Sequence, residues 1–212
     1  MRTDDLIAAL AGNLEPVRNG EATRRLIGTL ALGLAGSAAV MLVALGPRHH
    51  FVLVMQHFGM WMKLAYTFAL AAFGLWLVER AGRPGAGLAR PALMLVLPLL
   101  AIAVLASLQL AAPGADVQNL LLGHSSQVCA GLIVMVAAPT LVATFWALRR
   151  LAPTRLGLAG AAAGMFAGAA GAFVYAFHCS EEAAPFVAIW YTLGIALTTA
   201  IGGFLGRWAL RW

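Results

Sequence analysis

Charged residues are scarce in this chain of 212 residues: Asp, Glu, Lys and Arg make up only 10% of it, and hydrophobic residues make up 62%. Soluble domains contain roughly 25% charged and about 45–50% apolar residues. The shortage of charge excludes a soluble globular enzyme and a disordered regulator. Because the whole chain has two cysteines, a disulfide-dense secreted module is excluded as well.

Catalytic signatures are also missing. The sequence contains no phosphate-binding loop, dinucleotide fingerprint, nucleophile elbow or kinase motif, and its cysteines do not form a Cys-x-x-Cys pair. The net charge of +6 comes from arginines that flank apolar runs rather than from a basic helix or arm. We therefore predict a protein that is not an enzyme and does not bind nucleic acid directly.

Six apolar runs are each long enough to cross a membrane, which takes about 20 residues of helix. They predict an all-α fold, an integral membrane bundle of six transmembrane helices. The first run is longer than the apolar part of a signal peptide and is expected to remain as an anchor. The predicted spans are 26–45, 59–78, 91–111, 128–148, 156–177 and 185–206.

Basic residues are distributed unevenly between the two sides of these spans. Twelve of the fourteen flank the spans on one side, and only Arg48 and Lys63 lie toward the other. Because basic loops stay in the cytoplasm, we expect both termini there. The chain then divides into an N-terminal tail (1–25), a transmembrane domain (26–206) and a short C-terminal tail (207–212). Lys63 lies near the outer end of the second span, from which its ammonium can snorkel to the membrane surface.

Small residues recur at four-residue intervals on the fifth and sixth predicted helices. Such stripes let helix backbones approach closely in a membrane, and we expect tight packing within the molecule rather than a dimer interface. Pro98 and Pro139 are expected to kink their helices. The stripes are Gly160, Gly164 and Gly168 on one helix, and Gly194, Thr198, Gly202 and Gly206 on the other.

The N-terminal tail contains one short amphipathic segment. Its apolar stripe consists of Leu6, Ile7, Leu10 and Leu14, which fall on one face of a helix. Residues 1–17 carry more acidic than basic side chains, which weakens attraction to an anionic membrane surface. A groove on a partner protein is the other surface that takes such a face, and we favour partner binding over membrane docking.

All five histidines and both cysteines fall at the outer ends of the predicted spans. Cys129 begins the fourth span and Cys179 follows the fifth, so both are expected at one membrane level. Three interpretations stay open. The cysteines form a regulatory or structural thiol pair that a disulfide can join, or they are inert. Alternatively, they hold a soft metal ion with His178, His124 or Glu181. No cofactor is expected beyond such a transient ion at Cys129, Cys179 and His178.

Two segments carry a resemblance to a known family: the opening Thr-Asp-Asp-Leu-Ile-Ala-Ala-Leu10 with Pro16-Val17, and His178-Cys-Ser-Glu181 with Trp190-Tyr191. On a six-span topology this combination resembles the NrsF group, inner-membrane negative regulators of sigma factor F. The resemblance covers the whole chain. It implies an anti-sigma factor of the bacterial inner membrane that holds an extracytoplasmic-function sigma factor until stress releases it. It also implies a sensory role for Cys129 and Cys179. Trp190 and Tyr191 are expected to pack under the His-Cys loop.

We therefore predict a membrane-bound anti-sigma factor whose tail stripe binds the sigma factor and whose cysteines sense an oxidant or a heavy metal. Three alternatives remain. A small transporter or metal-handling protein would use the outer His/Cys cluster, but the span interiors lack the ionisable residues that transport usually needs. A membrane thiol–disulfide enzyme would need a Cys-x-x-Cys pair. A structural subunit would have no sensing role.

Overall fold

The computed structural model describes residues 3, 21–47, 56–83, 85–151 and 153–211. Within this part of the chain every regular element is helical and no strand forms, as predicted. The predicted tail stripe (Leu6, Ile7, Leu10 and Leu14) lies outside the described residues. The elements are α2 (Glu21–Val40), the π-helical turn η1 (Met41–Leu45), α4 (Phe58–Ala81), α5 (Ala89–Met94), α6 (Val96–Leu110), α7 (Val117–Leu122), α8 (Ser126–Arg149), α9 (Leu156–Tyr175), α10 (Ala184–Phe186), the π-helical turn η2 (Val187–Tyr191) and α11 (Thr192–Ala209).

Among the described residues, six helical stretches are long and apolar enough to cross a membrane, and they coincide with the six predicted windows. The largest difference precedes the fourth span, where the short helix α7 replaces an expected loop. Asp116 caps α7, since its Oδ1 accepts a hydrogen bond from the Asn119 backbone N–H at 3.1 Å. The six stretches are Ile27–Leu45, Phe58–Ala81, Ala89–Leu110, Val117–Arg149, Leu156–Tyr175 and Ala184–Ala209.

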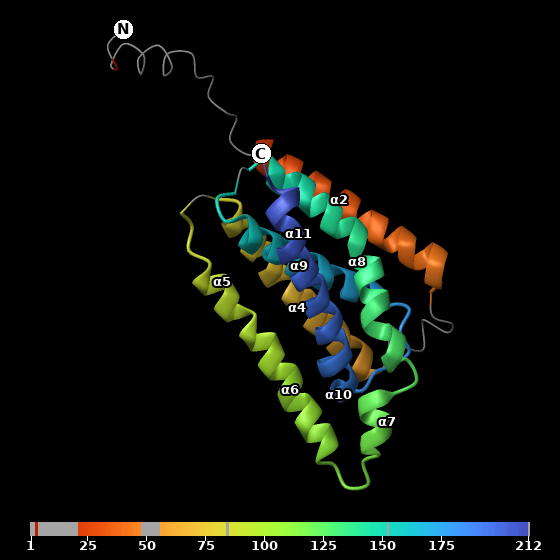
Figure 1. The fold of residues 1–212 in the computed structure, drawn as a ribbon. Helices are drawn as coiled ribbons and strands as arrows, with labels where there is room; N and C mark the ends of the chain where they lie inside the picture. Colours follow the sequence, from red (N-terminus) through yellow and green to blue (C-terminus); the bar gives the residue numbers. More distant parts are fainter. Residues whose placement is uncertain (1–2, 4–20, 48–55, 84, 152, 212) are drawn as a thin grey trace.

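Helix α9 forms the centre of the bundle, with α4, α8 and α11 packed around it (Figure 1). Thirteen of its twenty residues are buried, and most of these are alanine or glycine. Small side chains let three helices approach one central helix at the same time. Helix α2 packs along α8 at one edge of the bundle, and α5 and α6 lie at the other edge (Figure 1).

Most of the predicted small-residue stripes face each other between α9 and α11, which confirms packing within the molecule, whereas Gly194 faces Ile133 of α8. A Cβ atom added at Gly160 would lie 2.7 Å from the Cα of Gly206, and one at Gly202 would lie 2.8 Å from the Cα of Gly164. Real Cβ atoms essentially never come this close to a backbone atom. Glycine is therefore required along this contact by the distance between the two backbones.

Pro98 interrupts the third span. The chain leaves regular helix at Leu95, between α5 and α6. The ring of Pro98 clashes with the Met94 carbonyl four residues earlier, and the proline nitrogen has no hydrogen to donate to that carbonyl. Pro139 lies inside α8, which continues through it.

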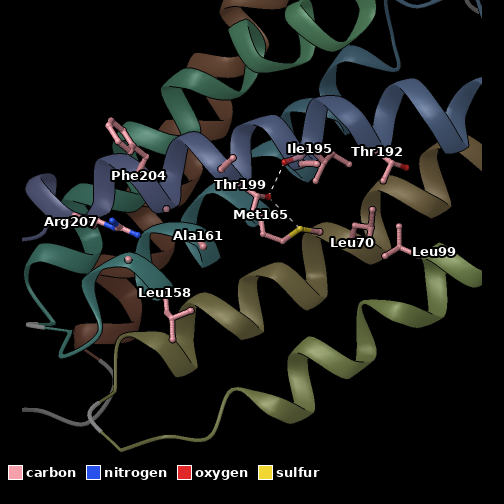
Figure 2. Close-up of a pocket in the computed structure, with 14 residues that line it drawn as sticks. Leu70, Leu99, Leu158, Ala161, Met165, Thr192, Ile195, Thr199, Phe204 and Arg207 are labelled. Atoms are coloured by element: carbon pink, nitrogen blue, oxygen red, sulfur yellow. Dashed lines mark hydrogen bonds between the residues drawn. The ribbon is translucent and has the colours of Figure 1, made fainter.

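A groove of about 750 Å³ opens between α6 and the face formed by α4, α9 and α11 (Figure 2). Its two threonines use their hydroxyls inside the protein: Thr199 donates to the Ile195 carbonyl at 2.8 Å, and Thr192 pairs with the Tyr66 hydroxyl at 2.7 Å. The rest of the wall is mainly apolar, with Arg207 at one end. Such a wall suits a hydrocarbon chain better than a polar substrate.

Candidate functional site

The two cysteines meet at one end of the bundle, which we call the thiol end. Cys129 lies in the first turn of α8, and Cys179 lies in the loop of residues 176–183 that joins α9 to α10, which we call the thiol loop. Both are free thiols, with exposed fractions of 0% and 3%. Both side chains belong to the same buried cluster. The fold therefore brings the two thiols together at one end of the bundle and shields them from solvent.

Hydrogen bonding and charge favour the thiolate form of Cys179. The hydrogen bond from the Cys129 thiol has the largest effect and lowers the pKa of Cys179. Burial opposes this, and the nearby Lys63 ammonium lowers the pKa again, so that it lies below its ordinary value. Because the thiolate is the form of cysteine that attacks oxidants and binds soft metal ions, Cys179 has the character of the attacking thiol. Cys129 is its neighbouring thiol in the buried cluster.

Lys63, the only lysine of the chain, lies beside this pair. The prediction that it snorkels to the membrane surface is wrong, since its exposed fraction is 0%. Its Nζ donates to the carbonyl oxygens of Cys179 at 2.9 Å and Glu181 at 3.0 Å, and it lies 5.8 Å from the centre of the Tyr191 ring. The thiol loop offers carbonyl oxygens within reach of the ammonium, so the charge is satisfied inside the protein.

The consecutive residues Glu181 and Glu182 connect the thiol loop to two further segments. Glu181 accepts a hydrogen bond from the His124 backbone N–H at 2.8 Å, and its carboxylate lies 3.6 Å from His124 Nδ1. The Glu182 carboxylate lies 3.2 Å from Nδ1 of His57, the residue that precedes α4. The loop is thus held by the segment before α4 and by the segment before α8.

Two glycines make room for these carboxylate-bearing residues. A Cβ atom at Gly59 would lie 2.6 Å from the Cβ of Glu182, and one at Gly123 would lie 2.6 Å from the Cδ of Glu181. Gly123 also has a φ of +50°, a backbone conformation that favours glycine. Larger residues at either position would push the thiol loop away from its neighbours.

The predicted metal ligands do not gather around the thiols. His178 Nδ1 lies 2.9 Å from the Gly46 carbonyl oxygen, just after η1, and Glu181 pairs with His124. Among the residues that the structure describes, no group of three or more His, Cys, Asp or Glu side chains is arranged to hold a metal ion. The described geometry favours chemistry of the two thiols over a centre with three or more protein ligands.

Tyr191 and Trp190 both pack at the thiol end as expected. The Tyr191 ring is fully buried, its centroid lies 5.8 Å from that of Tyr175, and both rings belong to the same buried cluster as the two cysteines. Trp190 is partly buried against this cluster, and its Nε1 donates to the Leu121 carbonyl in α7 at 2.9 Å. Both residues lie in η2, and π-helical turns occur frequently at functional sites.

The sequence-based prediction does not include three residues of the site: Tyr175, Gln109, and Lys63 in its role as a buried hydrogen-bond donor to the thiol loop. Gln109 Oε1 accepts a hydrogen bond from the Ala184 backbone N–H at 2.8 Å, which ties α6 to the end of the thiol loop. An ionisable residue within an apolar span is itself a signal for function, and that signal points to Lys63. Nothing in the sequence singles out Tyr175 or Gln109.

The fold and the site define a helical protein with six stretches able to span a membrane and one buried pair of thiols at an end of the bundle. The chain belongs to the NrsF family, described as negative regulator of sigma F, whose sequence model matches residues 10–212. This confirms the predicted family. A probable anti-sigma-F factor NrsF of Azospira oryzae is 38% identical over 213 residues. The anti-sigma-F factor NrsF of Caulobacter vibrioides is 40% identical over 217 residues. Both similarities cover the whole of both chains. No solved structure matches.

Proposed function

We propose that this protein is an anti-sigma factor of the bacterial inner membrane that sequesters an extracytoplasmic-function sigma factor. The family match over residues 10–212 and the two full-length anti-sigma-F relatives carry the proposal. Six apolar helical stretches account for most of the residues that the structure describes. The described segments that join them are short, which suits holding a partner better than catalysis.

The arrangement of arginines supports an orientation with both termini in the cytoplasm. Arg80, Arg149 and Arg207 each lie in the last turn of a spanning helix, at the end opposite the thiols. Arg149 Nε there donates to the Ala209 carbonyl oxygen and joins α8 to α11. Because basic residues stay on the cytoplasmic side, the thiol end then faces the periplasm and the partner binds at the arginine end.

The tail stripe is the proposed contact with the sigma factor, and a pair of substitutions tests it. In the predicted tail helix, Ala8 lies on the face opposite Leu10. Leu10→Asp places a charge in the apolar contact and is expected to abolish co-purification of the sigma factor with the full-length protein. Ala8→Asp adds the same charge on the other face and is expected to retain it. Retention by both variants would show that the stripe does not bind the sigma factor.

In the same proposal, Cys129 and Cys179 sense thiol-reactive stress. An oxidant forms the Sγ–Sγ bond and takes up the two electrons and two protons that the thiols lose, whereas a soft metal ion replaces the protons and bridges the two sulfur atoms. Either change alters how α8 packs against the thiol loop, and a local change of this kind can bias a partner-binding state. We expect Cys129→Ser and Cys179→Ser proteins to hold the sigma factor but to lose induction of a sigma-dependent reporter by diamide. Normal induction in both would contradict the sensing role.

A further inference from the structure

The burial of Lys63 needs an explanation that packing alone does not give. A buried ammonium is costly unless it is fully hydrogen-bonded, and an apolar side chain would fill the same space without that cost. Lys63 nevertheless has an exposed fraction of 0%. Its hydrogen-bond partners include the carbonyl oxygens of Cys179 and Glu181, which both lie in the thiol loop. An ionisable residue kept inside a spanning helix is a sign of function.

One of these carbonyl oxygens belongs to the reacting residue itself. The Lys63 Nζ donates to the Cys179 carbonyl oxygen at 2.9 Å. A displacement of Cys179 therefore lengthens this hydrogen bond or moves the ammonium with it. Disulfide formation requires the two Cβ atoms to lie about 3.5–4.5 Å apart with a restricted torsion around the sulfur atoms. Meeting this requirement moves the Cys179 backbone relative to the Lys63 ammonium that holds it.

Helix α4 extends this contact to the opposite end of the bundle. It runs without interruption over 24 residues, which corresponds to about 36 Å. Lys63 lies in its second turn, and near its other end Val78 is fully buried in a cluster with Leu148 and Leu210. A displacement of Lys63 can therefore move packed side chains at the arginine end.

We propose that Lys63 is the positioning residue through which a reaction of the two cysteines is passed to α4, and through α4 to the end of the bundle that binds the partner. The inference rests on the proposed function. The competing routes run through α9, because the Cys179 backbone N–H donates to the Tyr175 carbonyl at 3.1 Å and joins the loop to that helix, and through α8, which carries Cys129. A substitution at Lys63 separates the proposed route from these two, since it removes the hydrogen bonds from α4 to the loop and leaves the α8 and α9 connections in place.

The test compares full-length variants in cells that carry a sigma-dependent reporter, before and after diamide. Lys63→Met removes all hydrogen-bond donors of the side chain, whereas Lys63→Arg keeps the charge and several donors. Thr67→Val, one turn further along α4, is the matched control, because the Thr67 hydroxyl donates only to the carbonyls of Lys63 and Leu64 in its own helix. Immunoblotting measures the amount of each protein, and alkylation gel shifts measure the Cys129–Cys179 disulfide.

In the Lys63→Met protein we expect the disulfide to form, while the induction ratio of the reporter falls about fivefold or more toward one. Lys63→Arg restores induction, and Thr67→Val responds as the wild type. A merely structural role of Lys63 would lower protein amount and disulfide formation together, and would not separate disulfide formation from induction.

Wild-type induction in Lys63→Met cells would overturn the inference and leave the routes through α8 and α9. If the Lys63→Met protein does not accumulate, the Lys63→Gln variant is measured instead, since an amide is uncharged but keeps N–H donors. Wild-type induction of this variant, together with a normal disulfide, overturns the inference in the same way. Failure of the proposed sensing role gives a different result: Cys129→Ser cells then still induce the reporter after diamide. In that case the inference fails together with the sensing role, whatever the Lys63 variants show.

Discussion

The close contact between α9 and α11 predicts a large effect of the smallest possible substitution, Gly164→Ala. The added Cβ would meet the Thr198 carbonyl oxygen and lie 2.7 Å from the Thr199 Cα, both backbone atoms. Ordinary van der Waals contact begins at 3.4 Å. The two helices must therefore move apart locally, because neither atom belongs to a side chain that can turn away.

The size of the effect follows from two opposing contributions. Overpacking of a well-packed core costs about 1–3 kcal/mol, and replacing glycine by alanine within a helix returns about 0.5–1 kcal/mol. The middle values of these ranges leave a fall of about 1 kcal/mol in the free energy of unfolding. For a chain of this size, this corresponds to a melting temperature lower by about 2–4 °C.

The measurement is thermal unfolding of the full-length protein in detergent micelles, followed by far-ultraviolet circular dichroism at one fixed heating rate. Gly131→Ala in α8 is the matched control, because an added Cβ there meets nothing within 4 Å, and it should leave the melting temperature unchanged or raise it. A Gly164→Ala protein that melts at or above the Gly131→Ala protein would refute the close approach of α9 and α11.

Two further predictions concern α2 and the thiol pair. Ser37 and Thr140 share a buried hydrogen bond of 2.8 Å between α2 and α8. Ser37→Ala leaves the Thr140 hydroxyl unpaired and should cost about 1–2 kcal/mol in the same melting assay, whereas Ser107→Ala, whose hydroxyl donates only to its own helix, should have little effect. Because the pKa of Cys179 is lowered, its thiolate absorbance in the ultraviolet should persist as the pH falls below the ordinary thiol range. In Cys129→Ala, which lacks the donating thiol, the absorbance should disappear at higher pH. Identical titrations would contradict the assigned hydrogen bond.

The spans and the glycine contact could be predicted from the sequence because both depend on local composition. An apolar run of the right length specifies a spanning helix, and Gly160 with Gly164 specifies a helix face that admits a close neighbour. The site could be predicted only in part. Cys129 and Cys179 follow from their positions at adjacent helix ends. The loop carbonyls that hold Lys63 depend on how 178–182 folds back over α4, which no single segment encodes. The snorkelling rule for lysines near a span end therefore predicted that the Lys63 ammonium reaches the membrane surface, whereas carbonyl oxygens of the protein itself bind it.

Under the proposed sensing role, the burial of the two cysteines determines what kind of stress signal the protein can follow. A reagent reaches side chains with exposed fractions of 0% and 3% only during moments when the thiol loop has opened. When reaction with the opened state is faster than reclosing, the overall rate equals the opening rate and no longer rises with reagent concentration. At reagent concentrations above this limit, the fraction of reacted protein depends on how long the exposure lasts and not on the concentration. A short pulse would then leave the sigma factor bound, and a sustained exposure would release it.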